Sequence, residues 1–92
     1  MTGSEMRVTL RKAEISVLEA AQLFQVSRFT VYRWCRDKAV KPKNLFIYTR
    51  ACEITHKIEK AVASHRLPLT DPKILKRQRL GFIELALKNR KR

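Results

Sequence analysis

Residues 16–37 read SVLEAAQLFQVSRFTVYRWCRD, and they contain two sets of helix-start signals close together. Ser16 and Glu19 have the spacing of a capping box, in which the serine hydroxyl accepts from the glutamate amide and the glutamate carboxylate accepts from the serine amide. Ser27 is a second candidate for the N-cap of a helix. The pattern therefore predicts two short helices joined by a tight turn.

The second helix, expected at residues 28–36, has an apolar side and a basic side. At 100° per residue, the apolar side carries Val31, Trp34 and Cys35. The opposite side carries Phe29, Tyr32, Arg33 and Arg36, and Arg28 lies at the leading end of the helix. We expect the apolar side to pack on Ala20, Ala21 and Phe24 of the first helix, because small side chains allow two helices to cross closely. The aromatic and basic residues should then face outward.

This stretch resembles the DNA-binding helix-turn-helix of MerR-type regulators and phage excisionases, with the pattern T-x-x-E-A-A-x-L-x-x-V-S-x-x-T-V-Y-R-W. It is also similar to the tri-helical unit of lambda-type phage repressors. The resemblance covers about residues 14–37 and implies four packing positions, namely Ala21, Val26, Val31 and Trp34. It implies that the residues at the DNA are Ser27 to Phe29, Tyr32, Arg33 and Arg36. Gln25 stands where these families usually have glycine, so we expect a left-handed backbone there at a cost of about 1 kcal/mol.

The basic side of this helix has the chemistry that double-stranded DNA requires. A major groove about 12 Å wide admits one helix, whose N-terminal residues meet base edges. Arg28 and Arg33 can bind guanine with both ends of the guanidinium, and Phe29 can contact a thymine methyl. Phosphate contacts would position the protein without reading sequence. The predicted DNA-binding residues are Ser27, Arg28, Phe29, Thr30, Tyr32, Arg33, Arg36, Lys38, Lys41 and Lys43.

The charge of the chain points to a polyanionic partner. The formal net charge is +13 over 92 residues, and such a field attracts nucleic acid or an anionic membrane surface. Two basic blocks carry it: residues 28–50 have seven cations against Asp37, and residues 73–92 have eight against Glu84. No apolar run approaches the roughly 20 residues that span a bilayer. The two cysteines belong to no CxxC pair, which favours a reducing, cytoplasmic location. The expected DNA binding would make the protein nucleoid-associated there.

Outside the central stretch, the sequence divides into four further segments of a single, mainly α domain. Polar and apolar residues alternate over Arg7–Arg11, which predicts an N-terminal arm or strand within residues 1–15. A core helix is expected at 49–66, with its apolar stripe at Ile54, Ile58 and Val62. Residues 70–92 should form a C-terminal helix, capped by Thr70 or Asp71 and ending in a basic tail.

The segment at residues 38–48 leaves two alternatives open. It could be a basic loop with a short β-wing at 39–48, because LFIYT is rich in strand-forming residues, and Thr49 would then cap the next helix. Alternatively, Asn44 caps one long helix that continues through His65, as in lambda-type repressors. The short connection without glycine argues against the wing.

Taken together, these features predict a sequence-specific DNA-binding transcriptional regulator that acts as a homodimer through the C-terminal helix, with one recognition helix in each of two major-groove segments. RNA polymerase is a further candidate partner if the protein activates transcription. The alternative is an excisionase-like, partition or architectural factor that bends or coats DNA. Enzyme activity is not expected, because the chain lacks an acidic cluster for metal-assisted phosphoryl transfer. No cofactor or metal is expected either, since Cys52 and His56 match no zinc-binding pattern.

Overall fold

A computed structural model of the chain describes residues 2–37 and 39–88, and within them the protein is helical and contains no strand. The elements follow in the order α1 (Gly3–Lys12), α2 (Val17–Phe24), α3 (Arg28–Cys35), the 3-10 helix η1 (Pro42–Asn44), α4 (Leu45–Ala63), the 3-10 helix η2 (Lys76–Gln78) and α5 (Arg79–Lys88). The expected mainly α fold class is confirmed.

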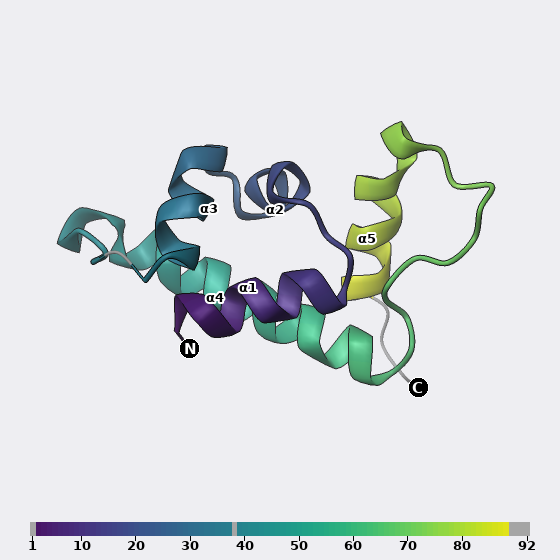
Figure 1. The fold of residues 1–92 in the computed structure, drawn as a ribbon, viewed down its shortest axis with the longest axis horizontal. Helices are drawn as coiled ribbons and strands as arrows, with labels where there is room; N and C mark the ends of the chain where they lie inside the picture. Colours follow the sequence, from purple (N-terminus) through teal and green to yellow (C-terminus); the bar gives the residue numbers. More distant parts are fainter. Residues whose placement is uncertain (1, 38, 89–92) are drawn as a thin grey trace.

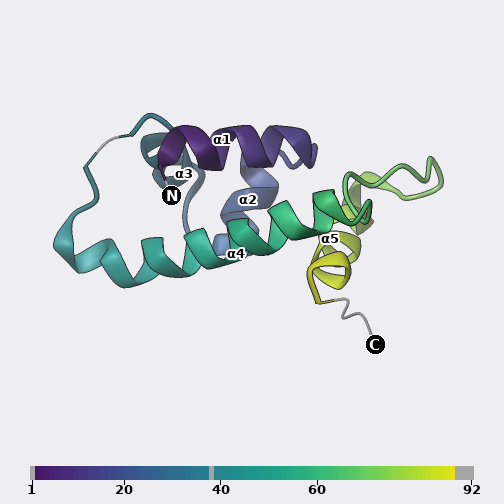
Figure 2. The same ribbon diagram turned by 90° about the horizontal axis from the view of Figure 1, so that it is seen from below.

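The helices form two layers around one core (Figures 1 and 2). Helices α1 and α4 run side by side, while α2 and α3 lie together on one side of them and α5 packs against α2 and α4. Each helix supplies buried side chains to the same core, among them Met6, Leu10, Ala20, Phe24, Val31, Trp34, Ile58 and Ile83. The α2–α3 pair is therefore supported from below by α1 and α4, and α3 keeps one side free.

The N-terminal segment is a helix, so the expectation of an arm or strand within residues 1–15 is wrong. The Thr2 hydroxyl accepts from the Glu5 amide at 3.1 Å, and the Glu5 carboxylate accepts from the Thr2 amide at 2.7 Å. This capping box begins α1. Met6 and Leu10, four residues apart, are buried on one side of the helix. The helical spacing of these two residues outweighs the short alternation that suggested a strand.

The middle segment follows the long-helix alternative, and the β-wing at 39–48 is wrong. Helix α4 begins at Leu45, with Asn44 at the N-cap position but without a hydrogen bond from its side chain to the helix. Thr49 lies inside the helix instead of capping it, and its hydroxyl donates to the Leu45 carbonyl oxygen at 2.8 Å. Tyr48 packs on the core from this helical turn, so the strand propensity of LFIYT is overridden by tertiary packing.

The C-terminal helix begins later than the sequence predicts. The Asp71 carboxylate accepts from the Lys73 amide at 2.9 Å, which closes a local turn instead of starting a helix. The chain then passes through η2, and α5 begins only at Arg79. Ile83 is the buried residue of α5, whereas Leu75, Phe82 and Leu85 are exposed. Lys88, the first residue of the predicted basic tail KNRKR, ends α5, and residues 89–92 lie outside the described residues.

Candidate nucleic-acid interface

Helix α2 begins at the predicted capping box of Ser16 and Glu19. The turn from α2 to α3 is then fixed by Gln25 and Ser27. Gln25 adopts the left-handed conformation expected of it, with φ 60° and ψ 45°. Ser27 then caps α3, accepting from the Thr30 amide at 3.2 Å. These features set the angle at which α3 leaves α2.

The apolar side of α3 is buried. Val31 is fully buried and Trp34 is 4% exposed, whereas Cys35 is only half-buried. The Trp34 ring lies 6.3 Å from the Phe24 ring of α2 and 5.1 Å from the Tyr48 ring of α4, measured between centroids. The contact between Trp34 and Phe24 agrees with the expected packing of the apolar side of α3 on α2. The contact with Tyr48 was not foreseen, because it depends on α4 beginning before that residue.

The opposite side of α3 is exposed and carries aromatic rings beside guanidinium groups. Phe29 is 65% exposed and Tyr32 is 46% exposed. The Arg28 guanidinium carbon lies 5.2 Å from the centroid of the Phe29 ring, which is a cation–π contact. Arg33 and Arg36 are also exposed, and together with the two aromatic rings they line a shallow groove. This face combines an exposed apolar surface with positive charge.

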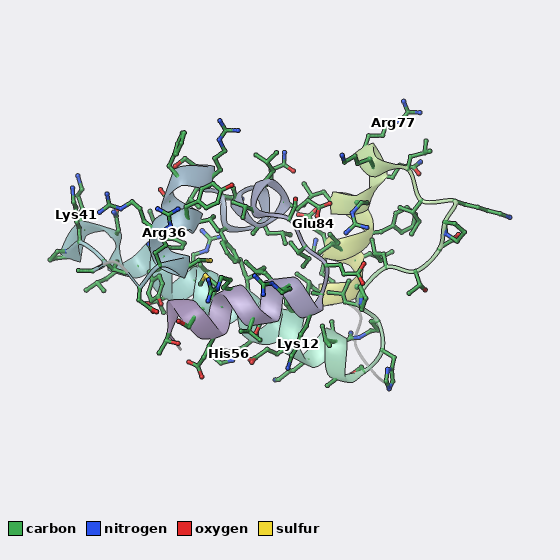
Figure 3. All side chains as sticks on the ribbon, viewed as in Figure 1. Lys12, Arg36, Lys41, His56, Arg77 and Glu84 are labelled. Carbon is green, nitrogen blue, oxygen red and sulfur yellow. The ribbon has the colours of Figure 1, made fainter. Side chains whose placement is uncertain are left out.

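A second groove connects α3 to the basic loop. Its charged lining comes from Arg33 on α3, Lys41 just before η1 and Lys43 within η1, and Thr30 and Asn44 also line it. In Figure 3, Lys41 projects at the same end of the molecule as Arg36. The structure therefore brings Lys41 and Lys43 to the exposed side of α3. Lys38, also predicted as a phosphate contact, lies outside the described residues.

The C-terminal end of α3 is held to α1 by Asp37. Its carboxylate oxygens accept from the Gly3 amide and from the Ser4 hydroxyl, both at 2.7 Å. The Ser4 hydroxyl, followed by the Gly3 amide, lowers the pKa of the Asp37 carboxyl below its ordinary value. A side chain at Gly3 would collide with the Trp34 carbonyl oxygen. This contact has no signal of its own in the sequence, although the Thr2–Glu5 capping box indicates the helix that makes it.

The other titratable side chains form no site for a metal ion. Within residues 2–37 and 39–88, no three His, Cys, Asp or Glu side chains are grouped so that they could hold one. His56 is exposed, and its Nδ1 atom lies 2.9 Å from the Glu59 carboxylate. Cys52, by contrast, is half-buried near Tyr48, and burial together with the neighbouring thiol raises the pKa of Tyr48 to about 12.

Comparisons with protein-family models, with curated proteins and with solved structures find no match to this chain. Among the described helices, none combines the length and apolar character needed to cross a bilayer.

Proposed function

We propose that the protein is a sequence-specific, double-stranded DNA-binding regulator of transcription, in which α2 and α3 act as a helix-turn-helix and α3 enters the major groove. One observation carries this proposal. Trp34 and Val31 are buried while Phe29, Tyr32 and the α3 arginines remain exposed on the opposite side. A helix that is held from behind in this way can present its outer side as a rigid unit.

Each exposed residue of this face has a role in the proposed complex. Arg28 and Arg33 donate to guanine edges, and Phe29 contacts a thymine methyl. Ser27, Thr30, Tyr32 and Arg36 contact the DNA at the edge of the groove, where phosphates lie. Lys41 and Lys43 neutralise phosphates beside the α3 contacts, because they share a groove with Arg33.

The protein is further proposed to act as a homodimer through α5. Leu75, just before η2, and Phe82 and Leu85 of α5 are 49%, 42% and 65% exposed, so these apolar side chains remain uncovered. A second copy can cover them with the same residues, since a two-fold interface is self-complementary. Two α3 helices would then read two half-sites. Analytical ultracentrifugation of wild type and of Leu85→Glu tests this, and equal masses as monomers would refute it.

A second candidate function is an excisionase-like or architectural factor that coats DNA. Another exposed apolar cluster, Leu45, Phe46 and Ile47, lies at the start of α4, at the other end of the molecule from α5. Contact between unlike patches of successive copies produces an open array instead of a closed dimer. Footprints that spread from the first site along the DNA would favour this function.

Selection of binding sites from random duplexes tests the main proposal. We expect a consensus sequence, with a palindrome if the protein binds as a dimer. Arg33→Ala should then weaken binding to the selected site more than binding to random DNA, by about 1–3 kcal/mol of discrimination. Lys41→Ala, the matched loss of one charge, should weaken binding to both equally. The absence of any consensus would overturn sequence-specific recognition.

A further inference from the structure

Three exposed cations outside the proposed α3 interface lie in the segment that leads into α5. They are Lys73, Lys76 and Arg77, and we call them the η2 cluster. Neither of the two ion pairs found in the described part of the chain involves them. The nearest acidic residue in the sequence is Asp71, whose carboxylate accepts from the backbone amide of Lys73. The η2 cluster thus presents three positive charges to solvent.

The η2 cluster is held beside α2 by Arg79, the first residue of α5. The Arg79 Nε atom donates to the Glu19 carboxylate at 2.8 Å, and its Nη2 atom donates to the Glu14 carbonyl oxygen at 2.7 Å. Glu19 lies in the first turn of α2. Burial alone would raise the pKa of Glu19, but the hydrogen bonds from Arg79 and Ser16 outweigh it and lower the pKa. A contact between residues 60 positions apart therefore fixes η2 near the start of α2.

The η2 cluster and the beginning of α3 lie along the same edge of the molecule. In Figure 1, α3 and α5 stand on either side of α2, and the chain enters both helices at the upper edge, away from α1 and α4. Figure 3 shows Arg77 projecting from this upper edge, whereas Lys12 and His56 are at the lower edge. The molecule is 40 Å along its longest axis, which exceeds the roughly 34 Å of one turn of DNA.

We propose that the η2 cluster is a second DNA-contact surface, which neutralises backbone phosphates of the same duplex beyond the segment that α3 reads. This inference depends on the proposed function, because it takes α3 as the element that docks in the groove. Lysine and arginine on an exposed turn can approach phosphates without reading bases. The expected consequence is a longer footprint and a steeper salt dependence than α3 and its loop alone would give.

The test compares two variants that lose the same number of charges. Lys76→Ala/Arg77→Ala removes two cations of the η2 cluster, and Lys12→Ala/Lys60→Ala removes two exposed cations from α1 and α4. Each protein is titrated, over a range of salt concentrations, into two duplexes that contain the selected site. The short duplex ends with the bases that α3 protects, and the long duplex extends by about one helical turn on each side. Circular dichroism establishes that both variants are folded.

On the long duplex, the η2 variant should bind on the order of ten-fold more weakly than wild type, and the slope of log Kobs against log salt should fall by about 2. On the short duplex it should match the control variant. The loss should be equal for selected and scrambled long duplexes, because phosphates carry no sequence.

Three results would overturn the inference or its premise. If the η2 variant matches the control on the long duplex, the η2 cluster does not contact DNA. If it weakens binding equally on both duplexes, its contact does not lie beyond the α3 segment. If wild type binds neither duplex, the proposed function itself fails, and this outcome is distinct from the other two.

Discussion

The indole ring of Trp34 lies edge-on against the ring of Tyr48, with centroids 5.1 Å apart and ring planes at 73°. This contact joins the buried side of α3 to the first turns of α4. Since Trp34 also faces Phe24 of α2, one side chain holds three helices together. The direction in which the outer side of α3 faces therefore depends on how this indole is packed.

Replacing the indole should separate stability from DNA binding. Trp34→Ala should lower the free energy of unfolding by about 3–5 kcal/mol, the usual cost of truncating a large buried aromatic residue. Tyr32→Ala, on the exposed side of the same helix, should change it by less than about 0.5 kcal/mol and yet weaken DNA binding. Urea denaturation followed by circular dichroism measures the free energy of unfolding of both variants. Similar destabilisation by the two variants would contradict the assigned sides of α3.

The sequence predicted α2 and α3 well because their signals are local. The capping box at Ser16, the cap at Ser27 and the apolar spacing of Val31 and Trp34 all lie within a few residues of what they determine. The same kind of box at Thr2 was available for α1. The polar–apolar alternation over Arg7–Arg11, which is typical of a strand, conflicts with this signal. Caps and apolar spacing therefore predict a helix from the sequence when they agree, as in α2 and α3, and fail when another local pattern conflicts with them, as in α1.

The remaining features depend on contacts between distant segments. Asp37 holds Gly3 across 34 positions, and Arg79 holds Glu19 across 60. Neither pairing has a periodicity that a single sequence displays. Tyr48 lies in a helix and not in a wing, and its ring packs against Trp34 of α3, a contact that the local sequence does not reveal. Lys41 and Lys43 follow α3 closely in the sequence, but the sequence alone does not show that they share a groove with Arg33.

The two glycines of the chain should respond to alanine in opposite ways. At Gly3 a Cβ atom would collide with the backbone of Trp34, whereas at Gly81, in α5, it would meet nothing within 4 Å. Gly3→Ala should therefore destabilise the protein by about 1–3 kcal/mol, as overpacking against backbone does. Gly81→Ala should stabilise it by about 0.5–1 kcal/mol, because alanine is favoured over glycine in a helix. Thermal unfolding of both variants tests this, and a harmless Gly3→Ala would argue against the close approach of α1 to α3.

Glycine at Gln25, the left-handed residue of the α2–α3 turn, should increase the stability of the fold. Gln25→Gly should stabilise the fold by up to about 1 kcal/mol, since it relieves the steric cost of a positive φ. Gln22→Gly, at an exposed position inside α2, should destabilise it by about 1 kcal/mol. Equilibrium unfolding in urea compares the two. If both substitutions destabilise to the same extent, the backbone at Gln25 is not left-handed in solution.

Acid should weaken the junction between α1 and α3. The pKa of Asp37 is lowered below its ordinary value of 3.8 by the Ser4 hydroxyl and then by the Gly3 amide. A carboxyl with a lower pKa in the folded state stabilises the fold above its unfolded pKa, and this contribution is lost as the pH falls through the folded pKa. The free energy of unfolding should therefore decrease below about pH 4.

Two substitutions assign this loss to the Asp37 contact. Asp37→Asn should be less stable than wild type at pH 7, and its stability should fall less between pH 7 and pH 3. Ser4→Ala should reduce the drop in the wild-type background but change it little in Asp37→Asn, because its effect acts through the same carboxylate. Urea unfolding of the four proteins at both pH values provides the comparison. An unchanged drop in Asp37→Asn would mean that other carboxylates, such as Glu19 with its Arg79 partner, carry the acid sensitivity.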